Sequence, residues 1–165
     1  MSANQEIKVL VVDDESINLK NVSHALASEG YDIETASGGG EAVEKIARIP
    51  FDLIITDLKM AEIDGVQVME AAQNMLPDVQ VIIITGYATV HSAVEAMAKG
   101  AFYYLPKPFK LRELRDLVKK ALAPVGLRKD LARSKQRSLA QKGVTRFVGR
   151  NSAILKLKDD IAQVA

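Results

Sequence analysis

The sequence of 165 residues contains no cysteine, which excludes disulfide bonds and thiolate metal sites. It also has no apolar run of the ~20 residues that a membrane-spanning helix needs. Residues 1–6 lack both the basic and the apolar segment of a signal peptide. The only two histidines, His24 and His91, have no partner at metal-ligand spacing, and we expect both to be structural. These absences predict a cytoplasmic chain without membrane contact, and no Ser-His-Asp or Cys-His arrangement can be drawn from it.

The net charge of +1 hides an uneven distribution of charge along the chain. Residues 1–109 contain 7 Lys and Arg against 16 Asp and Glu, a net charge of −9. Residues 110–150 contain 13 basic and 3 acidic side chains, a net charge of +10. An acidic front and a basic rear indicate two units with different roles. The basic stretch is open to two interpretations, a solvated helix and linker or a surface that binds a partner. It lacks the interleaved aromatic residues that would favour direct nucleic-acid binding.

Apolar runs of strand length alternate with segments of helical periodicity through the first 122 residues. The predicted strands are 7–12, 31–36, 51–56, 79–84 and 101–105, and the predicted helices are 17–29, 41–48, 66–76, 89–98 and 111–122. Ser16 is expected to cap the first helix and Gly30 to stop it, while Gly100 should end the fourth. Strands that alternate with helices across short loops predict a parallel sheet covered on both faces. Five β/α repeats of this size predict a flavodoxin-like, doubly wound (βα)5 domain of the α/β class.

The chain changes character after this domain. Pro124 and Gly126 are predicted to interrupt the last helix, and the following stretch is polar and basic with sparse leucines. The leucines do not recur in every half-heptad, so a coiled coil is not predicted. We expect a partly helical linker at 123–146, after the domain at 1–122, and the start of a further domain at 147–165.

The predicted strand at 51–56 runs directly into a carboxylate, Asp57. In open parallel sheets, ligands bind beyond the carboxyl ends of the strands, where Asp57 is expected to lie. The same reasoning brings four side chains from the ends of the other strands to this cleft: Asp13, Asp14, Thr85 and Lys107.

Three carboxylates that converge without a cation would repel one another. A hard divalent ion removes this repulsion, and Mg2+ prefers carboxylate oxygen, water and phosphate as ligands. Lys107 adds a positive charge and Thr85 a hydroxyl donor, so the set suits a phosphoryl group on Asp57. Each residue alone has an ordinary explanation, such as an acidic loop or a Thr85-Gly86 turn. The specificity lies in the combination.

Four stretches carry a resemblance to a known family: VVDDE at 11–15, ITDLKM at 55–60 with Asp64-Gly65, ITGY at 84–87 and YLPKPF at 104–109. With them, the chain resembles the receiver domain of bacterial two-component response regulators over nearly all of residues 6–122. The resemblance implies that Asp57 accepts a phosphoryl group from a sensor histidine kinase. It also implies that Asp14 binds Mg2+ directly, Asp13 through water and Lys59 through its main-chain carbonyl.

The same resemblance assigns the remaining site residues. Thr85, with Gly86, and Tyr104 would form the phosphate-binding switch, and Lys107 would pair with the phosphate. The side chains of Lys59 and Tyr87 would flank the approach of the water that removes the phosphoryl group, which makes self-dephosphorylation slow. A homodimer is expected to form through the face of the helix at 89–98, the fifth strand and the last helix, or through the linker.

The tail carries a second, shorter resemblance. Residues 147–165, beginning FVGRNSAI, look like the opening of the AAA+ ATPase domain of sigma-54-dependent activators of the nitrogen-regulator type. No G-x-x-x-x-G-K phosphate loop is present, because the glycines at 38–40 have no Gly-Lys at the required offset. ATP hydrolysis and contacts with sigma-54 RNA polymerase and DNA are therefore expected only from further sequence.

Three alternatives compete with this interpretation. An aspartyl-phosphate phosphatase of the haloacid dehalogenase type also starts from an Asp after a buried strand, but it needs a second Asp two residues later, where this chain has Lys59. A degenerate receiver used only for docking would not need the full acidic set. A different output domain, such as a winged helix, is disfavoured only by the short tail.

Overall fold

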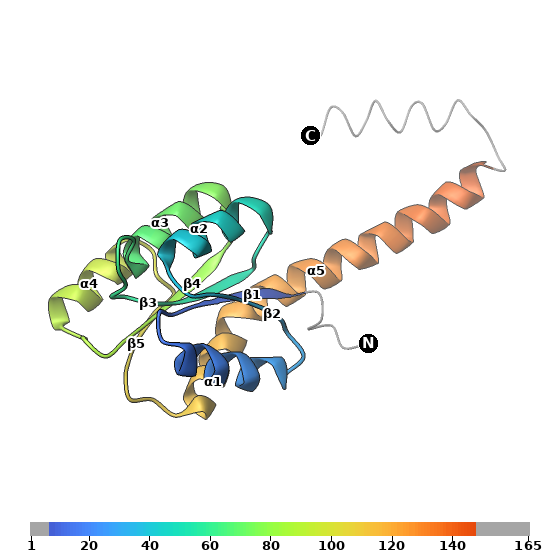
Figure 1. The fold of residues 1–165 in the computed structure, drawn as a ribbon. Helices are drawn as coiled ribbons and strands as arrows, with labels where there is room; N and C mark the ends of the chain where they lie inside the picture. Colours follow the sequence, from blue (N-terminus) through green and yellow to red (C-terminus); the bar gives the residue numbers. More distant parts are fainter. Residues whose placement is uncertain (1–6, 148–165) are drawn as a thin grey trace. The chain divides into compact units, whose positions relative to one another are not determined.

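Five parallel strands form a single sheet in the computed structural model, which describes residues 7–147 (Figure 1). The strands are β1 (Lys8–Val12), β2 (Asp32–Ala36), β3 (Leu53–Asp57), β4 (Gln80–Thr85) and β5 (Tyr103–Pro106). The helices between and after them are α1 (Ser16–Ala27), α2 (Gly39–Arg48), α3 (Gly65–Met75), α4 (Val90–Ala98) and α5 (Leu111–Phe147). The further domain expected at 147–165 lies, apart from its first residue, outside the described residues.

The strand order is β2-β1-β3-β4-β5. β2 therefore lies on one side of β1, and β3, β4 and β5 follow in order on its other side. This reversal of the strand order at β1 creates a crevice over the carboxyl ends of β1 and β3, which is where ligands bind in doubly wound sheets. The predicted flavodoxin-like (βα)5 fold is confirmed.

Each strand contributes side chains to both faces of the sheet, because successive residues point in opposite directions. Val9, Val11 and Ile55 pack in one cluster with Leu26 of α1 and Leu114 of α5. The alternate strand residues pack in a second cluster with α2, α3 and α4, including Leu10, Ile54, Ile83, Ala42, Val68 and Ala96. Figure 1 shows α2, α3 and α4 on one side of the sheet and α1 on the other. Apolar runs in the central strands follow from this burial on both faces.

The predicted boundaries agree with the structure to within two residues, except at the end of the last helix. Gly30 and Gly100 adopt φ values of 94° and 105°, as expected for residues that follow a helix end. The prediction that Ser16 caps the first helix was wrong. Glu15 occupies the N-cap position, without a side-chain hydrogen bond, and Ser16 is the first helical residue.

The prediction that Pro124 and Gly126 interrupt the last helix was also wrong, because α5 continues to Phe147 with Pro124 inside it. Leu122 and Val125, on either side of the proline, are buried with 3% and 4% of their surface exposed. Pro124 itself is exposed, so water can solvate the carbonyl that loses its N–H partner. Packing against the sheet therefore outweighs the local preference. The chain divides into two compact units within α5, after Gly126. None of the helices among the described residues is long and apolar enough to cross a membrane.

Candidate functional site

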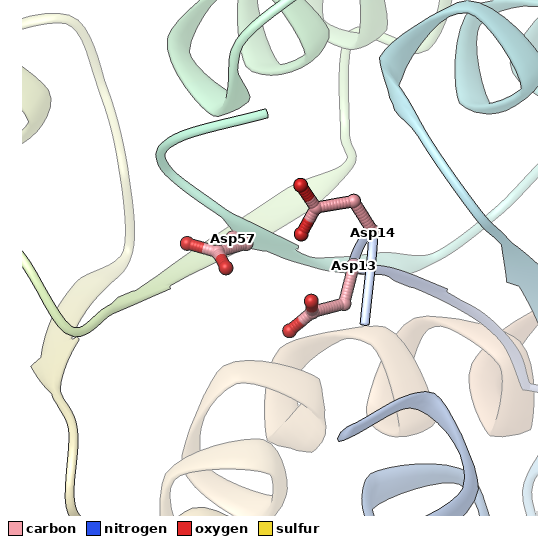
Figure 2. Close-up of side chains that lie close together, drawn as sticks. All are labelled: Asp13, Asp14 and Asp57. Carbon is pink, nitrogen blue, oxygen red and sulfur yellow. The ribbon is translucent and has the colours of Figure 1, made fainter. Parts of the chain in front are cut away.

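Three carboxylates meet at the carboxyl end of the sheet, as the strand positions predicted. Asp57 is the last residue of β3, and Asp13 and Asp14 follow β1 directly. One carboxylate oxygen from each lies within 4.8 Å of the others, and Figure 2 shows the three side chains around a shared space. Asp13 and Asp57 are buried, whereas Asp14 is exposed. The site therefore opens to solvent on the side of Asp14.

Lys107 joins the two buried carboxylates. Its Nζ lies 3.2 Å from Asp13 Oδ2 and 3.2 Å from Asp57 Oδ2. Burial raises the pKa of Asp57 above its ordinary value; the Lys107 ammonium opposes that rise and the Asp13 carboxylate adds to it. Burial acts to lower the pKa of Lys107, but the two carboxylates outweigh it and raise the pKa. The site thus holds a lysine that stays charged beside a carboxylate whose charge is costly.

The donor set fits Mg2+. All three side chains offer hard oxygen ligands, and they converge from two strand ends. A single lysine cannot neutralise three carboxylates, and a divalent cation would complete the charge balance.

Backbone contacts fix the orientation of the buried carboxylates. The amide of Glu15 donates to Asp13 Oδ1 at 2.9 Å, and the amide of Lys59 donates to Asp57 Oδ1 at 3.4 Å. Gly65 packs so closely that a Cβ there would lie 2.2 Å from the carbonyl oxygen of Asp57. Its amide donates to Leu58 O at 2.8 Å. This glycine holds the start of α3 directly against the end of β3.

Thr85, Gly86 and Tyr87 follow one another at the end of β4. Thr85 is fully buried, and its Oγ1 accepts a hydrogen bond from the Tyr87 amide at 3.0 Å. A Cβ added to Gly86 would meet no atom within 4 Å, so the backbone is open at this position. The Tyr87 ring is 65% exposed and lies under the Lys59 ammonium, with 4.5 Å from Nζ to the ring centre. Lys59 and Tyr87, expected to flank the approach to Asp57, therefore form a cation–π pair.

Tyr104 lies in β5 and is 9% exposed, packed in the same cluster as Ala96 and Ala101. Its hydroxyl lies 2.6 Å from Ser92 Oγ in α4. The ring is thus buried beside α4 in this structure.

A cavity of about 360 Å3 lies beside the carboxylates, between α1 and the segment that leads into α5. Asp57, Lys107, Asn21, Val22 and Phe109 are among its lining residues. Sequence reasoning missed this cavity, because its walls come from segments more than 80 residues apart.

The arrangement matches a known family in both sequence and structure. The family model for the response regulator receiver domain matches residues 9–119. The chain belongs to the response regulator receiver family. The resemblance inferred from the four motifs is confirmed.

Related chains extend this result. The transcriptional regulatory protein ZraR of Salmonella typhimurium is 33% identical over 160 residues, which cover 97% of this chain and 35% of that protein. A receiver domain protein from Clostridium thermocellum is 33% identical with a TM-score of 0.69, covering 73% of this chain and 98% of that one. The beryllofluoride-activated NtrC4 receiver domain dimer is 38% identical with a TM-score of 0.67, covering 71% and 97%. The chain spans about a third of the length of the curated relatives it matches.

Sequence reasoning identified the charged residues of this receiver site but missed two polar ones. Ser92 and Thr89 form a capping box at the start of α4, and Ser92 contacts Tyr104. A Thr-x-x-Ser pattern before a helix was visible in the sequence, but its link to β5 was not.

Proposed function

We propose that this receiver carries out phosphoryl transfer onto Asp57. A carboxylate oxygen of Asp57 attacks the phosphorus, an O–P bond forms, and the bond from phosphorus to the donor breaks with its electron pair leaving on the donor. With a phosphohistidine donor, the leaving atom is an imidazole nitrogen, which takes up a proton. The observation that carries the proposal is the buried Asp57 carboxylate, held 3.2 Å from Lys107 beside two further carboxylates.

The neighbouring residues take distinct roles in this proposal. Asp13, Asp14, Asp57 and the main-chain carbonyl of Lys59 would hold Mg2+, which when bound offsets the negative charge that gathers on the phosphoryl oxygens. The Lys107 ammonium pairs with the phosphoryl group and leaves its contact with Asp57 Oδ2 to do so. Thr85 donates its hydroxyl to a phosphoryl oxygen, and the open backbone at Gly86 lets that oxygen approach. Tyr104 responds as the second member of the switch.

A phosphatase of the haloacid dehalogenase type is the alternative enzyme. It would need an acid two residues after Asp57, and that position holds Lys59, whose ammonium sits over the Tyr87 ring. Lysine there favours a phosphoacceptor with slow self-dephosphorylation. The domain is then a signalling element, and any ATPase activity would reside in other sequence.

The wider setting follows from the same proposal. The donor is a sensor histidine kinase, the compartment is the cytoplasm, and the receiver occupies residues 1–122. Residues 123–146 connect it to a domain that starts at 147, and the output is sigma-54-dependent transcription. Support comes from the alignment with the transcriptional regulatory protein ZraR, which covers 97% of the chain and therefore reaches past the receiver match. A homodimer is favoured by the dimeric NtrC4 receiver.

Intact-protein mass spectrometry tests the phosphoacceptor directly. With Mg2+ and a small phosphodonor such as acetyl phosphate, the wild-type chain should gain one phosphoryl group, and Asp57→Asn should gain none. Asp52→Asn is the matched control, because Asp52 lies at the opposite end of β3, where its carboxylate accepts from the Lys8 amide. Equal labelling of wild type and Asp57→Asn would reject the assignment.

A further inference from the structure

The side chain of Tyr104 is tied to the first turn of α4 by one hydroxyl. Ser92 Oγ lies 2.6 Å from Tyr104 OH and 3.1 Å from the carbonyl oxygen of Thr89. The same oxygen lies 3.1 Å from the Thr89 amide and 2.9 Å from Thr89 Oγ1. The Ser92 amide completes the capping box by donating to Thr89 Oγ1 at 3.0 Å.

Proton counting shows how these bonds depend on one another. A serine hydroxyl has one proton and two acceptor sites. Ser92 Oγ accepts from the Thr89 amide, and either Ser92 or the phenol can supply the proton of the bond to Tyr104. If the phenol donates, the Ser92 proton can reach Thr89 O; if Ser92 donates, Thr89 O still accepts from the Ala93 amide at 3.0 Å. In both arrangements the bond joins β5 to the cap of α4.

The segment between β4 and α4 is consequently held at both ends. At its start, Thr85 Oγ1 accepts from the Tyr87 amide. At its end, the Thr89–Ser92 cap is fastened to Tyr104. A phosphoryl oxygen on Asp57 accepts the proton of the Thr85 hydroxyl, and movement of Oγ1 toward it changes the hydrogen bond from the Tyr87 amide. Movement of residues 86–89 then also displaces Ser92 and its hydrogen bond with Tyr104.

We infer that Ser92 is a positioning residue for the switch, whose hydroxyl carries movement of the 86–89 segment to Tyr104 and to α4. The inference rests on the proposed phosphoryl chemistry at Asp57. It adds a residue of α4 to the Thr85 and Tyr104 pair and explains why the Tyr104 ring is buried beside α4. Burial of the phenol is stable only while Ser92 supplies a partner for it.

Tyr104→Phe removes the phenol hydroxyl and keeps the ring. Ser92 retains its Thr89 partners in this variant, so the fold should be preserved. Loss of one hydrogen bond should speed amide exchange in the first turn of α4 roughly three- to tenfold. Tyr103→Phe is the matched control, because it makes the same chemical change on the neighbouring, exposed residue and should leave exchange unchanged. Exchange in Tyr104→Phe that equals the control would overturn the inference.

Ser92→Ala tests the other partner, and Ser92→Thr tests rescue. Ser92→Ala leaves the Tyr104 phenol buried without Ser92, so the ring should turn outward and become accessible to solvent, which aromatic NMR shifts report. Ser92→Thr keeps a hydroxyl and should return the ring to its buried position. The double variant with Tyr104→Phe should exchange no faster than Ser92→Ala alone, because both changes remove the same bond. Additive effects in the double variant, or a ring that stays buried in Ser92→Ala, would contradict the inference.

Beryllofluoride with Mg2+, a mimic of the phosphoryl group, separates this inference from the proposed function. Its binding to Asp57 is followed by 19F NMR, and the response of α4 by amide exchange. Wild type, Tyr104→Phe and Ser92→Ala should all bind the mimic, but only wild type should pass the full response on to residues 90–98. A failure of all three to bind would reject the phosphoacceptor assignment. Binding with an undiminished α4 response in both variants would reject only the role of Ser92.

Discussion

At the scale of single residues, Asp57 is both buried and a carboxylate, and in the metal-free protein burial makes its negative charge costly. Asp57 is only 8% exposed and its carboxylate lies near that of Asp13, while the single Lys107 ammonium offsets both charges. The resulting rise in the pKa of Asp57 means that the folded protein holds the proton of this carboxyl more tightly than the unfolded chain does. Stability is thus given up for reactivity, as is common at functional sites.

Asp57→Asn should raise the free energy of unfolding in the presence of EDTA, by roughly 1–2 kcal/mol at neutral pH. A raised carboxyl pKa lowers the stability of wild type as pH rises above the ordinary value near 3.8, through the pKa of the folded state. The difference in the free energy of unfolding between Asp57→Asn and wild type should therefore vanish at acid pH. It should reach a plateau at pH values above the folded-state pKa of Asp57. Urea unfolding of both proteins across pH measures it.

With Mg2+ present, wild type should instead have a higher free energy of unfolding than Asp57→Asn. Saturation at a hundred times the dissociation constant stabilises the folded state by about 2.7 kcal/mol, and Asp57→Asn should gain much less because it lacks a ligand. A stability difference that did not respond to Mg2+ would contradict the metal site.

Tyr87 gives a second test at this scale. Water must reach the phosphorus opposite the Asp57 oxygen, and the Lys59–Tyr87 pair is expected to flank that approach. Tyr87→Ala should lose the phosphoryl group several-fold faster, since loss of a ring that excludes water can lower the barrier by about 1 kcal/mol. Phosphoprotein decay after removal of the donor measures the rate. Tyr103→Ala removes an exposed ring from β5 instead and should decay like wild type; a wild-type rate in Tyr87→Ala would show that the ring does not shield the site.

At the scale of elements, the contact of α3 with the end of β3 supports the site. Gly65 begins α3, behind a capping box formed by Asp64 and Gln67. The space at Gly65 is closed by the backbone of Asp57 and Leu58, with no flexible side chain to yield. The position of Asp57 therefore depends on Gly65, a residue without a functional side chain.

Gly65→Ala should lower the free energy of unfolding by about 1–3 kcal/mol, the usual cost of overpacking. It should also slow labelling of Asp57, because the backbone that carries the carboxylate must shift. Gly40→Ala is the control: its Cβ would meet nothing within 4 Å, and it lies in the first turn of α2. Alanine there should be neutral or stabilising by up to about 1 kcal/mol. Equal stability of both variants, measured by urea unfolding, would contradict the predicted contact.

At the scale of the whole molecule, α4 and β5 carry a group of exposed apolar side chains. Val90 is 83% exposed, Val94 63%, Met97 47% and Tyr103 42%. Apolar side chains gathered on one face often mark an interface. This face lies beside Tyr104, and we therefore expect a change at Tyr104 to alter the affinity between two copies that meet here.

Beryllofluoride should strengthen dimerisation of wild type roughly tenfold to a hundredfold, since couplings of this kind are typically ~1–3 kcal/mol. Val94→Asp should weaken the dimer, because it places a carboxylate in the apolar face. Ile17→Asp makes the same type of change on α1, where Ile17 is 59% exposed, and should not affect dimerisation. Sedimentation with and without the mimic measures each affinity. In Thr85→Ala, beryllofluoride should no longer change the dimer affinity. If beryllofluoride does not change the dimer affinity of wild type, the proposed switch is excluded.

The sequence by itself determined the alternation of strands and helices, the parallel sheet and the positions of the charged site residues. Buried parallel strands read as continuous apolar runs, and their carboxyl ends share one edge, so Asp13, Asp57, Thr85 and Lys107 could be placed without coordinates. Only the tertiary structure decided three further features: the passage of α5 through Pro124, the close contact of Gly65 with Asp57, and the bond between Ser92 and Tyr104. Each depends on contacts between separate helices and strands, or on burial that outweighs local preference. Periodicity and spacing describe neighbours along the chain, and they carry no information about which side chains meet across it.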